Sequence, residues 1–599
     1  MRTAEEYNNF AAGLSQKGDF IHALKYFQLA LAINPNHQSI LNNLGIVLNN
    51  LSRPYEALGY LQRAMLLDPP NAETHFLIGN IMHEHGFTDI ALQRLKTAVK
   101  IDPRHAGALT NLGLIYKNMN RIREAVRYFR LAYQADPEHI KAYAYLLHCK
   151  RYLCDWRDYY QIASRLDALE NKQIKIDRMP VEEPFISVTR TADSKRNFEI
   201  TKIWAKDLND RYGRLKDTFS VTNKNRKHHR IRLGYLSADF RDHATSHLIL
   251  GLFRLHDKKK FSVNVYSYSD DDKSKYVERI KADSDKFVDL QKMSDYDCAR
   301  QINDDEVDIL VDLKGHTGNN RLRICTYRPA PIQITYLGFP GTTAAKFIDY
   351  MIADNIVVPG NAKYFTEKLI FLPNCYQIND NKQKISAIKF KRADFSLPEN
   401  AFVYCYLGQS YKIEPDVFEA WMRILKTVPK SVIWLMAYDA TSIKNLKKQA
   451  AKCGVRAGRL IFAGRLPKDE HLARLKLADL ALDTVTCNGH TSTSDCLWAG
   501  LPLVTLEGKH FASRVAASIL TAVGLPELIT YSLEEYKDLA IELATNPEKL
   551  LQLRLKLKSN RLTYPLFDTP MFVKNLEKAY EIVWRRYLKG LKPAKMIVK

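Results

Sequence analysis

Apolar, small and polar residues recur along the first part of the chain with a spacing of 34 residues. In each unit two positions hold alanine, one holds a bulky apolar residue, and proline stands near the end. These positions are Ala23, Ala57, Ala91 and Ala125, then Ala30, Ala64, Ala98 and Ala132, then Phe27, Leu61, Leu95 and Phe129, and finally Pro35, Pro69, Pro103 and Pro137. Small residues allow two antiparallel helices to approach closely, and proline cannot continue a helix. The pattern therefore predicts a row of helical hairpins.

The hairpins follow the tetratricopeptide (TPR) pattern, in which each unit leaves an apolar face that only its neighbour covers. Gly45, Gly79 and Gly113 keep the same spacing in the first helix of each hairpin. Residues 139–166 begin a fifth unit and then lose the pattern, which is typical of a capping repeat. We predict an all-α TPR solenoid over residues 1–166, followed by a helical linker over residues 167–228.

The pattern changes near residue 229 to short apolar, β-branched runs separated by helical stretches, which is typical of parallel sheets with crossover helices. The first predicted strands are IRLGYLSA, FSVNVYSY, VDILVDL, IQITYLGF and KLIFLPN, and the second set is AFVYCYLGQ, SVIWLMAY, RLIFAGRL, LALDTV and PLVTLEG. A lysine-rich connector over residues 381–396 separates the two sets. We predict a multidomain chain with two Rossmann-like α/β lobes, over residues 229–380 and 397–590.

Ligands of such sheets bind beyond the carboxyl ends of the strands, and the segments that follow these strands are rich in glycine and polar residues. They are SADFRDHATSH, GHTGNNRLRICTYRPAP and LGFPGTT in the first lobe, and GQSYK, GRLPKDEH and CNGHTSTSD in the second. CNGHTSTSD precedes a predicted helix, so its free amides are suited to hold a phosphate. The alternative is an ordinary helix cap, in which Thr491 or Ser492 satisfies those amides. The sequence contains no GxxxxGK[ST] or GxGxxG motif, and no DxD-type metal pair stands out.

The composition is that of a globular protein and argues against a membrane-spanning protein. With 46% apolar and 26% charged residues and no apolar run of membrane-spanning length, we expect a soluble protein, and the charged N-terminus predicts cytoplasmic residence rather than export. The nine cysteines show no CxxC pair or regular His/Cys spacing, which argues against a disulfide framework and a structural zinc site. The formal charge of +23 would attract several kinds of anion. No nucleic-acid-binding motif accompanies it, so we expect no nucleic-acid partner and assign most of the charge to solvated lysines.

The strings HCKRYLCDWRDY, LSADFRDHATSH, YRPAPIQITYLGFPGT, GQSYKI, LPKDEH, CNGHTSTSDCLWAG and ASRVAASIL closely resemble the O-GlcNAc transferase/SPINDLY family, in the same order and behind the same repeats. The resemblance covers nearly the whole chain and implies a GT-B architecture. It also implies a metal-independent, inverting glycosyltransferase that moves GlcNAc from UDP-GlcNAc to Ser or Thr hydroxyls of proteins, with no cofactor. The short connector between the lobes resembles that of compact, bacterial-type members.

The resemblance assigns roles to individual positions. Gln409 and Lys412 match the diphosphate contacts, and a lysine ammonium neutralises the charge that builds on a leaving pyrophosphate. The other matching positions are His490, Thr491 and Ser492 at the phosphates, Lys468 and Asp495 at the ribose, and His471 and Arg474 near the base. His243 matches the histidine that faces sugar and acceptor, as a general base or as an orienting group. His247 is interpreted as a packed or helix-capping histidine.

Further positions concern the sugar and the acceptor. Arg328, Gly338, Pro340 and Gly341 are expected to shape the sugar and acceptor pocket, although a proline-glycine loop is also ordinary turn chemistry. Asn9, Asn43 and Asn111 share the 34-residue spacing in the first helices, and Leu77 breaks the row. Their amides can bind the backbone of an extended acceptor peptide along the inner surface of the repeats, whereas the alternative is surface asparagines without a ligand. A homodimer is a further partner to test.

Two alternatives stay open. Gln301-Ile302-Asn303 stands where O-GlcNAc transferases tend to have an Arg-Ile-His run, which leaves the sugar undecided. Related proteins use GDP-fucose or UDP-glucose, and some distant relatives modify asparagine. The alternative from another class is a non-catalytic TPR scaffold with a degenerate transferase region.

Overall fold

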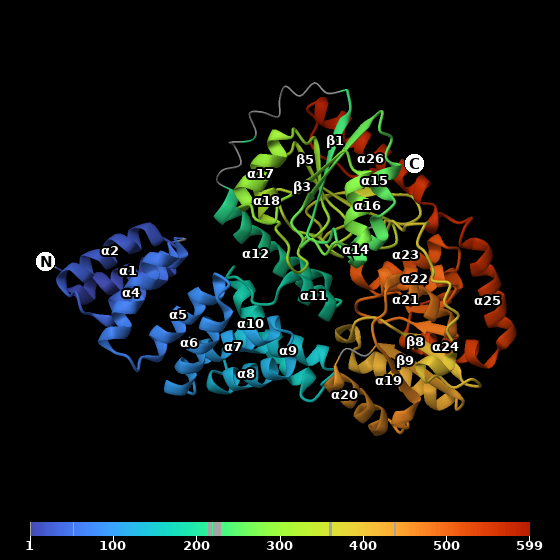
Figure 1. Cartoon of the computed structure of the whole chain (residues 1–599), viewed down its shortest axis with the longest axis horizontal. Coiled ribbons are helices and arrows are strands. Elements are labelled where there is room, and N and C mark those ends of the chain that lie inside the picture. Colours follow the sequence, from blue (N-terminus) through green and yellow to red (C-terminus); the bar gives the residue numbers. More distant parts are fainter. Residues whose placement is uncertain (1, 52, 214–218, 220–228, 359–361, 437–438) are drawn as a thin grey trace. The chain divides into compact units, whose positions relative to one another are not determined.

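The computed structural model describes residues 2–51, 53–213, 219, 229–358, 362–436 and 439–599 (Figure 1). The chain divides into two compact units, Met1–Tyr152 with Trp156–Glu170, and Leu153–Asp155 with Asn171–Lys599. The end of the predicted linker, residues 214–218 and 220–228, lies outside the described residues. No helix in the described part of the chain is both long and apolar enough to cross a membrane.

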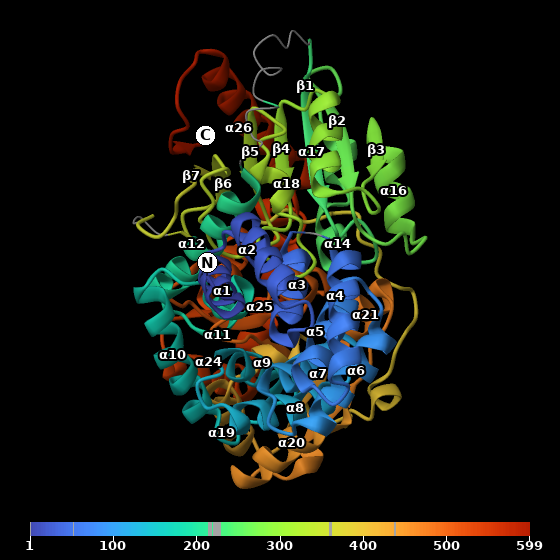
Figure 2. The same ribbon diagram turned by 90° about the vertical axis from the view of Figure 1, so that its left-hand side faces the viewer.

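The first unit is a row of antiparallel helical hairpins, as the repeat predicted (Figure 2). Its helices are α1 (Ala4–Gln16), α2 (Phe20–Ile33), α3 (Gln38–Asn50), α4 (Pro54–Leu67), α5 (Ala72–Glu84), α6 (Thr88–Ile101), α7 (Ala106–Asn118), α8 (Ile122–Ala135), α9 (Ile140–Tyr152) and most of α10 (Tyr159–Lys175). Contacts between successive first helices, from α1 through α9, run along the whole row. The first helices therefore form one continuous layer.

The periodic glycines show why the hairpins close tightly. A Cβ atom on Gly45 would lie 2.6 Å from Leu61, and one on Gly113 would lie 2.5 Å from Phe129. The periodic alanines are completely buried. The pattern thus marks places where the backbone of one helix meets a side chain of the next, and any larger residue there would force the helices apart.

The second unit includes α11 (Pro184–Arg190) and α12 (Ser194–Tyr212), which precede the first lobe. Its sheet is parallel, with the strand order β14-β7-β6-β5-β4-β1-β2-β3. The strands are β1 (Ile231–Ser237), β2 (Phe261–Ser267), β3 (Lys286–Asp289), β4 (Ile309–Asp312), β5 (Ile332–Thr335), β6 (Tyr350–Ala353), β7 (Lys368–Phe371) and β14 (Met596–Ile597). Connecting helices are α14 (Ala244–Ile249), α15 (Leu252–Leu255), α16 (Lys275–Asp283), α17 (Asp295–Asp304) and α18 (Arg323–Thr326).

The second lobe contains a six-stranded parallel sheet with the order β10-β9-β8-β11-β12-β13. Its strands are β8 (Phe402–Tyr406), β9 (Ser431–Met436), β10 (Leu460–Ala463), β11 (Leu480–Leu482), β12 (Leu503–Leu506) and β13 (Ile529–Thr530). Its helices are α19 (Pro415–Thr427), α20 (Ala440–Lys452), α21 (Lys468–Arg474), α22 (Thr491–Ala499), α23 (Val515–Ala522), α24 (Leu533–Thr545) and α25 (Pro547–Asn560). Residues 437–438, the end of the predicted strand SVIWLMAY, lie outside the described residues. The predicted fold class, a TPR array followed by two parallel α/β lobes, is confirmed.

The end of the chain returns to the first lobe. Helix α26 (Thr569–Leu588) packs against α15 and β5, and β14 pairs with β7. The Tyr580 hydroxyl lies 3.3 Å from the hydroxyl of Tyr235 on β1, and Glu577 accepts the amide hydrogen of Asp257 at 2.6 Å. The sequence interpretation instead assigned residues through 590 to the second lobe, because apolar periodicity does not reveal which sheet a terminal helix covers.

Candidate active site

His243 lies on the loop that follows β1 and caps the N-terminus of α14. Its Nδ1 atom accepts a hydrogen bond from the amide of Thr245 at 3.2 Å, so the neutral ring carries its proton on Nε2. The carboxylate of Asp239 lies 3.5 Å from the same Nδ1 atom. Burial lowers the pKa of His243, and the neighbouring Asp239 opposes this shift only in part. The geometry favours a neutral imidazole that donates through Nε2.

The loops after β4 and β5 touch each other closely enough to require glycine. A Cβ atom on Gly338 would lie 2.1 Å from the carbonyl oxygen of Leu313, and Gly315 has a left-handed φ of +53°. Buried Glu367 holds the second loop by accepting hydrogen bonds from the Thr342 hydroxyl and the Thr343 amide, at 2.5 and 2.6 Å. These contacts fix the LGFPGT loop, with Gly338, Pro340 and Gly341, at the carboxyl edge of the first sheet.

The side chain of Arg328, another predicted pocket residue, is held by hydrogen bonds to backbone carbonyl groups and to one carboxylate. Its guanidinium donates to the carbonyl oxygens of Phe347 and Pro331 at 2.8 and 2.9 Å, and to Asp349 at 3.0 Å. Asn303, from the Gln-Ile-Asn run, donates to the carbonyl oxygen of Pro329 at 3.1 Å. Both side chains hold the RPAP segment in place, so Asn303 of the Gln-Ile-Asn run supports this segment.

In the second lobe, Lys412 is fixed beside the turn that precedes α22. Its ammonium group donates to the carbonyl oxygen of Asn488 at 2.7 Å, from the short turn after β8 that Gln409 begins. Asp483, which follows β11, holds the same turn from beneath by accepting the amide hydrogen of Gly489 at 2.7 Å. Burial raises the pKa of Asp483 to about 6. The turn and the lysine therefore form one connected unit.

The N-terminus of α22 has no side-chain cap. His490 occupies the cap position, and its buried Nε2 atom has no hydrogen-bond partner among the described residues. Burial lowers the pKa of this histidine far below its ordinary value, so the ring is neutral. The ordinary-cap interpretation, with Thr491 or Ser492 bonding the first amides, does not describe this helix. An uncapped helix N-terminus beside a lysine presents free amides and positive charge, which suit an anion such as phosphate.

Helix α21 places the remaining predicted nucleotide residues on one side of α22. Lys468 contacts Asp495 at 2.5 Å, and His471 lies 4.0 Å from the same carboxylate. Arg474 is completely buried and donates to His471 and to the carbonyl oxygen of Gly464. Burial lowers the pKa of His471 to about 4. Arg474 thus orients His471 from behind, while Lys468 and Asp495 form a pair.

The two lobes meet where α14 contacts α22. His247 donates from Nε2 to the Asp242 carboxylate at 2.6 Å and packs against the ring of Tyr276, with ring centroids 4.6 Å apart. Burial is the main cause that lowers the pKa of His247 to about 4, and the charge of Lys468 on the second lobe lowers it further. His247 is a packed histidine, as interpreted from the sequence. Its neighbours also show that the His243 loop and the predicted ribose residues face one another.

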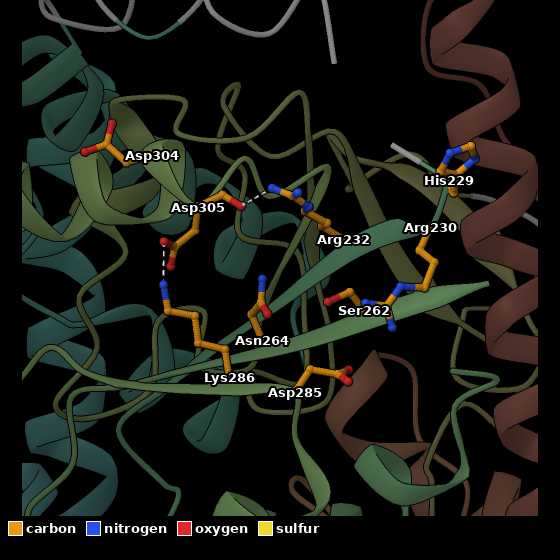
Figure 3. Close-up of a pocket in the computed structure, with 9 residues that line it drawn as sticks. All are labelled: His229, Arg230, Arg232, Ser262, Asn264, Asp285, Lys286, Asp304 and Asp305. Atoms are coloured by element: carbon orange, nitrogen blue, oxygen red, sulfur yellow. Dashed lines mark hydrogen bonds and ion pairs between the residues drawn. The ribbon is translucent and has the colours of Figure 1, made fainter. Parts of the chain in front are cut away.

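An open, polar hollow lies at the opposite, amino edge of the first sheet (Figure 3). Figure 3 shows Lys286 and Arg232 turned towards Asp305, with Lys286 bonded to its carboxylate at 2.6 Å and Arg232 to its carbonyl oxygen at 3.1 Å. Lys286 forms an ion pair with Asp305 inside the hollow, whereas Arg232 and Asp285 form theirs with Glu306 and Lys258 outside its lining. The predicted nucleotide residues and the LGFPGT loop lie at the carboxyl ends of the strands. Arg328, which precedes β5 and bonds to residues just before β6, instead lies at the amino end, away from the expected pocket.

The predicted acceptor asparagines of the repeats take part in bonds between hairpins. Asn43 donates to Asn8 at 2.9 Å, and Asn111 donates to Asn80 at 2.8 Å. Asn9 is exposed. The side-chain amide groups of Asn43 and Asn111 are thereby held in place between neighbouring hairpins.

Sequence comparison identifies the family. Residues 153–393 and 384–576 match the model of glycosyl transferase family 41, and residues 106–139 match a tetratricopeptide repeat. The chain belongs to glycosyl transferase family 41. The resemblance to the O-GlcNAc transferase/SPINDLY family expected from the motifs is thus confirmed, and the match covers both lobes.

Several curated proteins are similar to this family 41 chain. One is a probable UDP-N-acetylglucosamine–peptide N-acetylglucosaminyltransferase, SEC, of Arabidopsis thaliana, 38% identical over 75% of this chain and 47% of its own length. The Caenorhabditis elegans UDP-N-acetylglucosamine–peptide N-acetylglucosaminyltransferase is 28% identical over 73% and 48%, and Arabidopsis SPINDLY is 31% identical over 61% and 40%. The chain spans about half the length of the curated relatives it matches. The structure of an O-GlcNAc transferase mutant from Thermobaculum terrenum shares the fold, with a TM-score of 0.63, 24% identity, and coverage of 98% of this chain and 100% of that one.

Proposed function

We propose that this family 41 protein transfers N-acetylglucosamine from UDP-N-acetylglucosamine to serine or threonine hydroxyls of proteins, with inversion and without a metal ion. The observation that carries the proposal is the uncapped N-terminus of α22, with the Lys412 ammonium bonded to the turn before it and the unpartnered Nε2 atom of His490 beside it. The names of the relatives supply the donor and the peptide acceptor.

The proposed reaction is a single displacement. The acceptor hydroxyl oxygen bonds to C1 of the sugar while the bond from C1 to the β-phosphate oxygen breaks, and the hydroxyl proton passes to the leaving diphosphate or to water. Negative charge grows on UDP, and Lys412 and the amides of α22 neutralise it. Because these groups are already held by Asn488 and Asp483, they need little rearrangement when the charge appears.

His243 is proposed as an orienting donor rather than the general base. Its Nδ1 atom already accepts the Thr245 amide, so Nε2 holds a proton in the neutral ring and has no lone pair to take another. Burial lowers its pKa, which keeps the ring in this form at neutral pH. The Nε2 hydrogen is suited to hold a sugar or acceptor oxygen in position for attack.

Lys468 and Asp495 are proposed to bind the ribose, and His471, oriented by Arg474, to contact the base. Pro340 and Gly341 lie on the loop that would form the sugar side of the site. The first helices of the repeats are proposed to hold the acceptor polypeptide, through the side-chain oxygens of the asparagines already described.

Thermal shift and donor hydrolysis with UDP, GDP and their sugars test the donor. UDP at millimolar concentration should raise the melting temperature, because a ligand that binds only the folded state stabilises it. A rise with GDP and none with UDP would instead assign the chain to fucose transfer. Hydrolysis of UDP-glucose in preference to UDP-N-acetylglucosamine would change the sugar, and asparagine-linked product in mass spectrometry would change the acceptor. No hydrolysis and no shift with any donor would support the non-catalytic scaffold.

A further inference from the structure

A buried ion pair lies directly behind His243. The Lys314 ammonium, on the loop after β4, bonds to both carboxylate oxygens of Asp239 at 3.0 and 2.9 Å, and both side chains are about 95% buried. The Thr245 hydroxyl donates to the same carboxylate at 3.2 Å. Asp312 fixes the lysine loop by accepting the amide hydrogen of Gly315 at 2.6 Å. The pair joins the carboxyl ends of two neighbouring strands, β1 and β4.

Two neighbours of His243 compete for its Nδ1 atom. The Thr245 amide, at 3.2 Å, requires a lone pair on Nδ1. The Asp239 carboxylate, at 3.5 Å, favours a proton there, and an unneutralised carboxylate at this distance would also favour the charged imidazolium. Because Lys314 and the Thr245 hydroxyl both bond to the Asp239 carboxylate, its charge is balanced. Nδ1 of His243 therefore keeps its lone pair and accepts the Thr245 amide hydrogen.

We propose that Lys314, by neutralising Asp239, keeps His243 uncharged with its proton on Nε2, and is therefore a positioning residue for glycosyl transfer. The inference rests on the proposed function for its catalytic meaning, although the state of the histidine can be measured without any transfer. It predicts that the charge of the ion pair, and not only its packing, acts on His243.

Charged and titratable groups face His243 and its helix from three elements. From its own loop and helix these are Asp239, Arg241, Asp242 and His247. From the loop after β4 they are Lys314, with Asp312 behind it, and from the second lobe Lys468, His471 and Asp495, which lie towards α14. Of these, only Asp239 and Lys314 are joined to each other by two hydrogen bonds next to the ring. Substituting them one at a time therefore changes the charge beside His243 in opposite directions.

The experiment is a histidine NMR titration of the full chain labelled with ¹³C and ¹⁵N in histidine, with the His243 signal assigned by its loss in His243→Gln. In Lys314→Gln the titration midpoint of His243 should rise by about one pH unit or more, and the ¹⁵N shift of Nδ1 should show that this atom gains its proton at this higher pH. In Asp239→Asn the midpoint should fall. If Asp239→Asn does not fold, the double variant Asp239→Asn/Lys314→Gln, which restores neutrality, should return the midpoint towards that of the unmodified protein.

The matched control is Lys286→Gln, which breaks the ion pair with Asp305 at the opposite edge of the same sheet (Figure 3). It should leave the His243 titration unchanged. An unchanged midpoint in Lys314→Gln, or shifts in the same direction in Lys314→Gln and Asp239→Asn, would overturn the inference, because a purely structural pair predicts similar effects from both.

Activity gives a second readout. In Lys314→Gln the ratio of kcat/KM at pH 6 to that at pH 8 should fall by up to roughly tenfold relative to the unmodified protein, as expected for a one-unit shift of an essential neutral group. A loss that is equal at both pH values would contradict the inference. If the unmodified protein transfers no sugar from any donor, the proposed function fails, whereas the NMR titration still decides the role of Lys314.

Discussion

Replacing Lys412 by alanine should reduce turnover more than it reduces donor binding. The lysine is the cation bonded to the turn before α22, at 2.7 Å from the Asn488 carbonyl oxygen. Two unit charges about 4 Å apart interact by about 4 kcal/mol at an effective dielectric constant of about 20, and each 1.36 kcal/mol is roughly a factor of ten in rate. The loss of one preorganised electrostatic group typically costs 10²–10³ in kcat, which agrees with this upper value. We therefore expect kcat of Lys412→Ala to fall by about 10²–10³.

Donor binding should suffer less, because part of the charge that Lys412 neutralises appears only as the sugar departs. Steady-state assays of UDP release on a protein acceptor give kcat, and calorimetry gives the Kd of UDP. Lys426→Ala, which removes an exposed lysine from α19, is the matched control and should leave both unchanged. A Lys412→Ala variant with kcat within about threefold of the unmodified protein would refute the reasoning, and leaving-group stabilisation would then rest on the amides of α22 alone.

Three further predictions concern stability and acceptor choice. Gly113→Ala should destabilise the repeats by about 1–3 kcal/mol, because its Cβ would lie 2.5 Å from a buried ring. Gly59→Ala, which has open space around it, should stabilise them by about 0.5–1 kcal/mol. Changes of the same sign in the free energy of unfolding of both variants, measured in urea, would contradict this. Asn43→Ala/Asn111→Ala should reduce transfer to whole proteins but not donor hydrolysis or short-peptide transfer, and an equal loss in all three assays would indicate a damaged fold. Burial lowers the pKa of His316 to about 4, so its contribution to stability is present above pH 6.5 and is lost as the pH falls towards 4. In His316→Asn, urea titrations at pH 7, 6 and 5 should show a free energy of unfolding that depends less on pH, by up to about 1.4 kcal/mol per pH unit.

Much of the architecture could be predicted from local pattern. Repeat spacing located the hairpins, and the ten apolar runs chosen as strands all contain strands of the two sheets. These features depend on neighbouring residues, so a single sequence contains them. The strands that were not predicted are β3, β6, β13 and β14, and two of these have only two residues each. Such short edge strands have too few alternating positions to be recognised.

The candidate site was predictable by segment but not by contact. Every polar loop chosen from the sequence begins at the carboxyl edge of a sheet, because that position follows from strand order in parallel sheets. The loop of residues 315–331 continues to the amino end of β5. The ion pair of Asp239 with Lys314 joins residues 75 positions apart, and no local pattern connects them. The sequence does show that each residue follows a predicted strand, since an aspartate comes after the first strand and a lysine after VDL. Arg328 shows the opposite case, because its structural bonds could not be distinguished from a pocket role without coordinates.

The return of α26 and β14 to the first sheet has a consequence for biosynthesis. On the ribosome, β1 emerges long before its partner Tyr580, and β7 emerges before β14. The second lobe, whose strands all lie between Phe402 and Thr530, can complete its sheet while the first lobe still lacks a helix and an edge strand. The lobe that is translated first is thus finished last. His243 and Lys314 belong to that lobe, whose last helix and edge strand are among the last residues of this sequence to be translated.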